Sequence, residues 1–198
     1  MTATLGLERV PGSIATLIDE AAANLLTIAN QLDALVHGDP SSLEEMARSE
    51  DTGDRIVHDL IRETSDSWRV GPDRARLIAL AQAVDDVIDA LQELAWSWPQ
   101  QPLPELADLL LALRDTVRDA GHAVAAVERE ARLRARLARC REREQEVRRL
   151  GRTARAWLVV EQRDPQLAIR GHHILRQADA ALRACTRLRF RLDCDAHA

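Results

Sequence analysis

Hydrophobic residues recur every three to four positions along most of this chain, which is the period of an α-helix rather than of a β-strand. The pattern is clearest between about Ile14 and Val36. An apolar stripe runs along that segment, made of Leu17, Ile18, Ala21, Leu25, Ile28, Leu32 and Leu35. Helix breakers are few, and no stretch has a credible strand pattern. The pattern therefore predicts an all-helical protein.

Glycine and proline divide the first half of the chain into three helices. The first helix ends at Gly38-Asp39-Pro40. The second begins with the capping-box sequence Ser41-Ser42-Leu43-Glu44 and runs to about Trp68. After Gly71-Pro72, Asp73 is the expected N-cap of a third helix that ends near Trp96.

The prolines between residues 99 and 104 cannot continue a helix and mark the boundary between two halves. The predicted units are an acidic three-helix unit at 1–98, a linker at 99–104 and an arginine-rich three-helix unit at 105–198. In the second unit, two helices meet somewhere between Val127 and Leu137, and Asp164-Pro165 begins the last connection.

Two pairs of acids stand out, because each pair is spaced by one helical turn and points two carboxylates in one direction: Glu50 with Asp54, and Asp85 with Asp89. At about 100° per residue, the first pair falls inside the apolar stripe of the second helix, together with Gly53. That stripe is formed by Leu43, Met46, Ala47, Val57, Leu60 and Ile61. The second pair flanks the stripe of the third helix, which is formed by Leu77, Leu80, Ala81, Val84, Ile88 and Leu91. Burying carboxylates without compensation is costly, so the spacing indicates a metal site, although a solvated helix face remains the alternative.

An all-oxygen site favours a hard ion, so the expected cofactor is a divalent or ferric cation: iron, zinc, manganese or magnesium. His58 follows Asp54 by four residues and is a candidate additional ligand. The alternative for His58 is a hydrogen-bonded residue at the edge of the stripe.

The acidic pattern repeats 94 residues later with each second acid replaced by arginine, as Glu144-x-x-x-Arg148 and Asp179-x-x-x-Arg183. The same offset separates Gly71 from Pro165. This repeat predicts two three-helix bundles in tandem. Because arginine cannot ligate a cation, the second copy is predicted to be metal-free, with Arg148 and Arg183 neutralising Glu144 and Asp179.

Charge divides along the same boundary. Residues 1–104 hold 18 acids and 7 arginines, net −11, whereas residues 105–198 hold 14 acids and 20 arginines, net +6. The basic half could face an anionic partner, or its arginines could simply solvate helix faces. The sequence shows neither an uninterrupted apolar span nor an apolar signal core, so a cytoplasmic location is expected. Cys140, Cys185 and Cys194 form no CxxC pair and are expected to be buried.

The sequence resembles the PhoU-like family of phosphate-transport accessory proteins, in particular the subgroup found beside Pit-type inorganic phosphate transporters. The residues that carry the resemblance are Asp73-Arg74, Leu77, Leu80, Ala81, the run Val84-Asp85-Asp86-Val87-Ile88-Asp89 and the earlier Glu50-Asp51-Thr52-Gly53-Asp54. It spans about Leu17 to Leu192 and is most specific between Glu50 and Asp89. It implies a PhoU-like six-helix bundle that binds a multinuclear metal cluster through E/D-x-x-x-D motifs. The matching metal positions are Glu50, Asp54, Asp85 and Asp89.

The expected function is therefore a cytoplasmic, non-enzymatic regulator that docks on the inner face of a Pit-type transporter, where it would lie peripheral to the membrane. One alternative is a helical module that binds polyphosphate or nucleic acid, although one Phe and no Tyr leave little for base stacking. A carboxylate-bridged metalloenzyme is less well supported, because the predicted sites lack Glu-x-x-His pairs. A further copy of the same chain, in a homo-oligomer, is the other partner that the sequence allows.

Overall fold

In a computed structural model of the chain, six α-helices make up nearly all of the described residues, which are 12–66, 74–98, 103–127 and 129–195. The helices are α1 (Gly12–Val36), α2 (Ser42–Asp66), α3 (Arg74–Ser97), α4 (Pro104–Val124), α5 (Glu130–Val160) and α6 (Pro165–Asp195). The predicted all-α class is confirmed. Trp68, Asp73 and most of the proline linker lie outside the described residues.

The turn from α1 to α2 is built differently from the predicted capping box. Gly38 closes α1 with a φ of 85°, a backbone conformation that glycine adopts without strain. The carboxylate of Asp39 then accepts hydrogen bonds from the backbone N–H and the hydroxyl of Ser41, at 2.9 and 2.8 Å. An aspartate two residues earlier thus orders this turn, because its short side chain reaches the backbone that follows.

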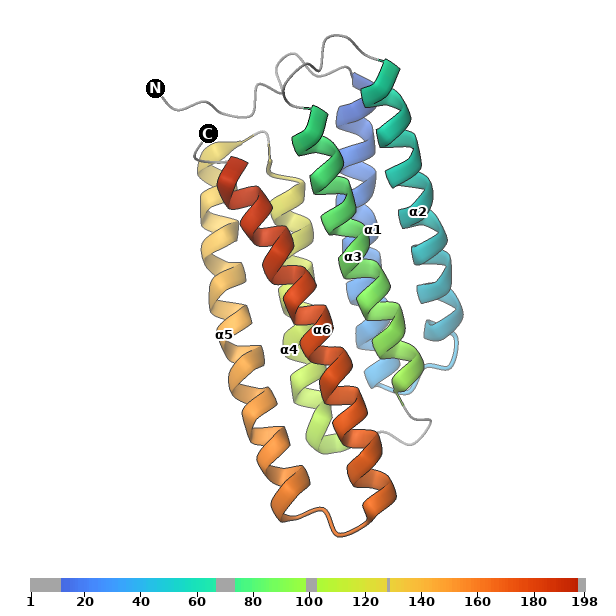
Figure 1. Cartoon of the computed structure of the whole chain (residues 1–198), viewed down its shortest axis with the longest axis vertical. Coiled ribbons are helices and arrows are strands. Elements are labelled where there is room, and N and C mark those ends of the chain that lie inside the picture. Colours follow the sequence, from blue (N-terminus) through green and yellow to red (C-terminus); the bar gives the residue numbers. More distant parts are fainter. Residues whose placement is uncertain (1–11, 67–73, 99–102, 128, 196–198) are drawn as a thin grey trace.

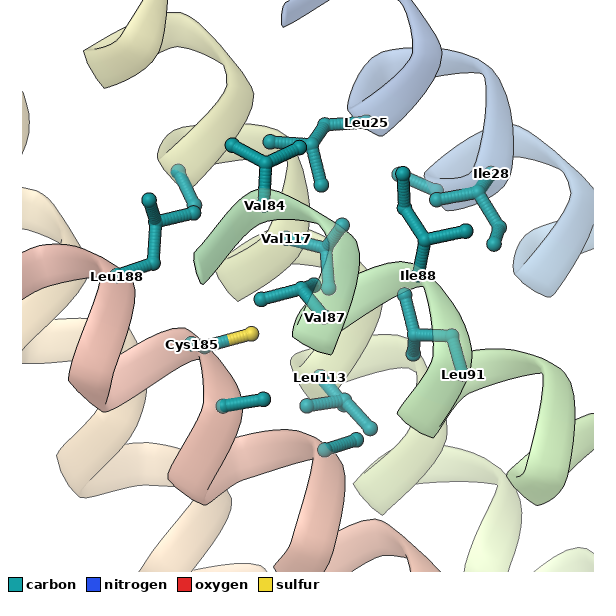
Figure 2. Close-up of a cluster of buried hydrophobic side chains, with 14 of the residues drawn as sticks. Leu25, Ile28, Val84, Val87, Ile88, Leu91, Leu113, Val117, Cys185 and Leu188 are labelled. Carbon is teal, nitrogen blue, oxygen red and sulfur yellow. The ribbon is translucent and has the colours of Figure 1, made fainter. Parts of the chain in front are cut away.

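The helices run side by side as a bundle, with α1, α2 and α3 in one half and α4, α5 and α6 in the other (Figure 1). The halves meet along two extensive contacts, α1 against α4 and α3 against α6. Between them lies a core in which Val87 of α3, Leu113 of α4 and Leu188 of α6 are fully buried (Figure 2). One hydrophobic core therefore includes residues from both halves, and the division into two tandem units remains a prediction from the sequence repeat.

The predicted apolar stripes of α1 and α3 are confirmed, since every residue assigned to them is buried. The stripe predicted for α2 is wrong in part. Leu43 and Ile61 are exposed, whereas Ser49 and Ile56, which were not assigned to the stripe, are buried. The buried side of α2 is rotated from the predicted one because this helix places small and polar residues against its neighbours.

No helix among the described ranges is both long and apolar enough to cross a bilayer.

Candidate functional site

The four predicted ligands lie on two neighbouring antiparallel helices, α2 and α3, which pack against each other. We call this set the acidic seam; it comprises Glu50 and Asp54 of α2 with Asp85 and Asp89 of α3. One polar contact joins the two helices at the seam, in which Gln92 of α3 donates to the carboxylate of Glu50 at 3.5 Å.

The seam is less buried than the sequence indicated. Glu50 and Asp85 are half-buried, whereas Asp54 and Asp89 are exposed. Asp54 was expected inside the apolar stripe, and that expectation is wrong. The cause is the rotation of α2, which puts Gly53 rather than Asp54 against α3.

Gly53 brings α2 close to α3 at the middle of the seam. A Cβ added to this glycine would lie 3.2 Å from Oδ1 of Asp85 and 3.2 Å from Cδ1 of Ile88. A glycine at this point therefore lets the Asp85 carboxylate lie directly against the backbone of α2.

Burial and mutual repulsion make these acids hold protons more tightly than usual. Burial raises the pKa of Asp85 to about 6, and the charges of Asp89 and Asp54 add to the shift. Burial is also the largest cause of the raised pKa of Glu50, followed by repulsion from nearby acids, chiefly Asp54. The pKa of Asp89 is raised for the same two reasons. The seam therefore carries negative charge that its surroundings do not compensate.

None of the four seam carboxylates forms an ion pair with another residue in the part of the chain that the structure describes. Nor do three or more His, Cys, Asp or Glu side chains among those residues converge closely enough to hold one ion. His58, the candidate fifth ligand, is exposed on α2. The donors are hard oxygens on facing helices, but they lie along the seam rather than around one point.

The second copy of the motif satisfies its buried acid with arginine. Glu144 of α5 is 5% exposed and accepts hydrogen bonds from Nε and Nη2 of Arg189 on α6, at 2.7 and 3.4 Å. Arg148, the expected partner, is farther away, with Nη2 at 4.0 Å from the Glu144 carboxylate. Arg189 is the nearer partner because it reaches across from the facing helix and is itself 7% exposed.

The other acid of this copy also has an unexpected partner. Asp179 of α6 pairs with Arg155 of α5. Arg183, which was expected to neutralise it, is exposed and forms no ion pair with any described residue. The expectation that arginine compensates these acids is therefore confirmed, but the arginine assigned to Asp179 was wrong.

Three polar residues between α1 and α2 were not predicted from the sequence. Asn24 donates to the backbone carbonyl of Ser49 at 2.7 Å, and the Ser49 hydroxyl donates to Gln31 at 3.0 Å. All three are buried. Asn24 and Gln31 lie on the apolar side of α1, a position where a polar residue signals a hydrogen-bonded pair.

The missed partner Arg189 did leave a signal in the repeat. At the 94-residue offset, Arg189 corresponds to the buried Ala95, so a large cation replaces a small apolar residue in the second copy. Gln92, the partner of Glu50, has no such signal, because an amide at a helix edge is common in any sequence.

The cysteines follow the expectation except for one. Cys140 and Cys185 are buried, and burial raises the pKa of both thiols, that of Cys140 to about 12. Cys194 is exposed. The buried pair therefore behaves as small apolar residues rather than as thiolates.

A hollow of about 730 Å³ lies on the other side of α2, against α1. Its arginines are already paired with acids, Arg55 with Glu20 at 3.0 Å and Arg48 with Glu44 at 3.1 Å. With its charges matched internally, this hollow offers no strong preference for a charged ligand.

Sequence comparison with models of known protein families and with curated proteins gives no match in either case. The functional argument therefore depends on the residues and their arrangement.

Proposed function

We propose that the protein is a non-enzymatic cation-binding regulator whose acidic seam takes up a divalent or ferric ion. The observation that carries the proposal is that the seam carboxylates have no ion-pair partner among the described residues, while three of them have raised pKa values. A bound cation would relieve this repulsion, because it supplies the positive charge that Arg189 supplies to Glu144.

The residues fit such an ion by their chemistry. All four donors are carboxylate oxygens, which suit magnesium, manganese and ferric iron. Gly53 leaves room for the Asp85 carboxylate at the middle of the seam. Zinc would be favoured only if an imidazole joined the site, and His58 is the nearest candidate on α2. To hold one ion, the carboxylates would have to turn toward it.

The test is elemental analysis of the full chain purified without a histidine tag. We expect bound metal in the wild-type protein and a loss of it in the Glu50→Ala/Asp85→Ala double variant. The matched control is Asp108→Ala/Glu142→Ala, which removes two exposed acids on α4 and α5. Unchanged metal content in the seam variant would contradict the proposal, as would an equal loss in the control.

We further propose that the regulated partner is a Pit-type inorganic phosphate transporter, bound at its cytoplasmic side. The resemblance to the PhoU-like family, which is most specific in the segment from Glu50 to Asp89, supports this assignment. The division of charge between the two halves also supports it, because such a division suits docking on a charged surface. Three large apolar side chains near the turn between α5 and α6, Val159, Val160 and Ile169, are at least 70% exposed, which suits contact with a protein.

Co-purification with the transporter from the same cell tests this second proposal. Binding of the protein to the transporter should weaken as salt is added, because charges at the edge of an interface contribute to association through long-range attraction, which salt screens. If the transporter is retained at neither low nor moderate ionic strength, the accessory role is wrong, whatever the metal analysis gives.

A further inference from the structure

A cleft of about 400 Å³ lies where α4 turns into α5. Basic and small side chains line it, and none of the described residues that line it is acidic; they include His122, Arg129, Arg132, Ala135, Arg136 and Arg139. We call it the arginine cleft. The end of α4 and the start of α5, which supply its lining, belong to the half with the positive net charge, and they lie across the molecule from α2 (Figure 1).

The sequence itself places these arginines together. Arg132, Arg136 and Arg139 follow one another at intervals of four and three residues, so they share one face at the start of α5, and Arg129 lies at the N-cap of this helix. At about 1.5 Å per residue, the row from Arg132 to Arg139 extends for about 10 Å along the helix. Alanines in the turn after α4, and Ala135 between the arginines, leave the space in front of the row open.

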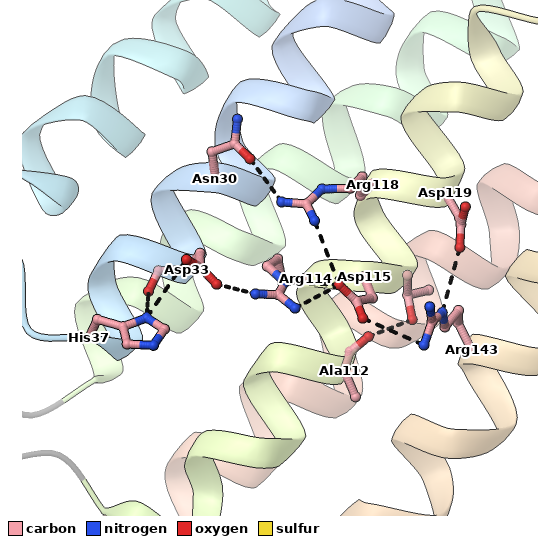
Figure 3. A network of polar contacts seen from close by, with 10 residues as sticks. Asn30, Asp33, His37, Ala112, Arg114, Asp115, Arg118, Asp119 and Arg143 are labelled. Atoms are coloured by element: carbon pink, nitrogen blue, oxygen red, sulfur yellow. Dashed lines mark hydrogen bonds and ion pairs between the residues drawn. The ribbon is translucent and has the colours of Figure 1, made fainter.

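Farther along α5, the same basic face is neutralised by α4. Arg143 lies 3.5 Å from a carboxylate oxygen of Asp115 and 3.6 Å from one of Asp119, as Figure 3 shows. Arg118 of α4 also turns to Asp115 and to Asn30 of α1. In this part of the bundle each arginine has its partner within the protein.

The arginine cleft lacks that compensation. Arg136 reaches Asp119 at 3.6 Å, but Arg129, Arg132 and Arg139 form no ion pair with any residue in the described ranges. Three guanidinium groups therefore line one cleft without a carboxylate. Repulsion among close positive charges disfavours such an arrangement unless solvent or an anion offsets it.

His122 reports the positive potential at the base of the cleft. Partial burial lowers its pKa, and the charges of Arg136, Arg118 and Arg139 lower it further, against an opposite effect from Asp119. The N-terminus of α5 adds its own partial positive charge to the same place.

We propose that the arginine cleft binds a short chain of linked inorganic phosphates. Guanidinium groups match phosphate oxygens in pairs and keep their charge at every physiological pH. A row about 10 Å long is longer than one phosphate can span, so two or three linked phosphates fit it better than a single one. The lining holds no Phe, Tyr or Trp to stack a nucleobase, which favours an inorganic chain over a nucleotide or a nucleic acid.

This inference goes beyond the cation-binding function and does not depend on it, since the cleft and the acidic seam lie on different helices. The hollow between α1 and α2 gives an internal contrast. It also contains arginines, but these are paired with acids. Of the two hollows, the arginine cleft is the one with arginines that lack an acidic partner among the described residues.

The test is isothermal titration calorimetry of the full chain with tripolyphosphate, orthophosphate and ATP at one fixed salt concentration. We expect tripolyphosphate to bind at least about tenfold more tightly than orthophosphate, because it engages several guanidinium groups at once. ATP should bind no more tightly than tripolyphosphate, since the cleft has no ring for the base.

Two variants, each with a control of matched charge, test whether tripolyphosphate binds in the arginine cleft. Arg132→Gln/Arg139→Gln should weaken tripolyphosphate binding by about tenfold or more, while the control Arg152→Gln/Arg163→Gln, with the same change in charge, should leave it within about twofold. Ala135→Glu places a carboxylate in the cleft and should abolish binding, whereas Ala138→Glu adds the same charge outside the lining and should not. All six substitutions in these four variants affect exposed positions, so circular dichroism should report an unchanged fold.

Each other outcome overturns the proposal. Absence of tripolyphosphate binding refutes the site, and equal losses in the cleft and control variants show binding to net charge alone. Tighter binding of ATP than of tripolyphosphate shows that a base is recognised, and the inorganic ligand is then wrong.

Discussion

Glu144 of α5 accepts a 2.7 Å hydrogen bond from Nε of Arg189 of α6, and both side chains are more than nine-tenths buried. Among the described residues, the polar partner of Glu50, the equivalent residue 94 positions earlier, is the amide of Gln92, at 3.5 Å. The same acid in two copies of one helical pattern thus has a built-in cation in one copy and none in the other. This difference is the physical basis for assigning cation binding to the first half alone.

The buried pair gives a prediction for stability. Arg189→Ala should destabilise the protein by about 3–5 kcal/mol, because it leaves the Glu144 carboxylate buried without its charge partner. Denaturation in urea measures the change. The exposed pair of Glu146 and Arg149 on α5 is the control, and Arg149→Ala should alter the free energy of unfolding by about 1 kcal/mol or less.

Replacing both members of the buried pair separates lost charge from lost packing. Glu144→Leu/Arg189→Met should recover much of the stability lost in Arg189→Ala, since apolar groups of similar volume need no partner. If Arg189→Ala matches the control variant, the pair does not act as a buried ion pair.

The acidic seam predicts an unusual pH dependence in the metal-free protein. The folded-state pKa of Asp85 is about 6, above its ordinary value of 3.8, so the folded state binds the proton more tightly than the unfolded state. The stabilisation that protonated Asp85 provides is therefore present at low pH and is lost as pH rises through about 6. Asp85→Asn should stabilise the protein at neutral pH by about 1 kcal/mol, after allowance for solvent screening at this partly exposed site.

Urea denaturation in the presence of a chelator, at acidic and at neutral pH, measures this effect. Asp108→Asn removes an exposed acid from α4 and is the control, which should follow the wild-type pH profile. An Asp85→Asn profile identical to that of the wild type would show that the seam carboxylate is not strained by burial and repulsion.

Much of the fold followed from sequence periodicity, because α1 and α3 carry continuous apolar stripes and helix ends coincide with glycine and proline. The orientation of α2 did not follow in full, since Ser49 and Thr64 lie on its buried side and neither counts as hydrophobic in a projection. The contacts between the two halves could not be predicted from the sequence repeat either. They depend on which apolar side chains of α1 and α3 fit α4 and α6, and not on their spacing.

The candidate site was predicted in position but not in environment. Four acids at helical spacing suffice to place the seam on neighbouring helices, and the structure does bring α2 and α3 together. Exposure of Asp54 and the contact of Asp85 with Gly53 depend on the rotation of α2. In the second copy, spacing alone favoured Arg148 and Arg183, whereas the partners are on facing helices, which a pattern within one helix cannot show.

Gly53 links the geometry of the seam to cation binding. Alanine at this position gains helix propensity of up to about 1 kcal/mol, but its Cβ would lie 3.2 Å from the Asp85 carboxylate and displace it. We expect Gly53→Ala to change stability by no more than about 1 kcal/mol and to weaken manganese binding, measured by calorimetry, by about tenfold. Gly151→Ala, on α5, should leave manganese affinity unchanged. Wild-type affinity in Gly53→Ala would show that Asp85 is not a ligand.

Two helical glycines of the second half should respond to alanine with opposite signs. A Cβ at Gly171 of α6 would lie 2.5 Å from Cδ2 and 3.0 Å from Cδ1 of Leu158, which is 2% exposed and has little room to move. Gly171→Ala should therefore destabilise the protein by about 1–3 kcal/mol through overpacking.

At Gly151 of α5 the atom nearest to an added Cβ, Nη1 of Arg155, would lie 3.7 Å away, an ordinary contact. Gly151→Ala should stabilise the protein by about 0.5–1 kcal/mol, because alanine loses less backbone entropy in a helix. Urea midpoints of the two variants measure the difference, and a shift in the same direction for both would contradict the close packing of α5 on α6 at Leu158.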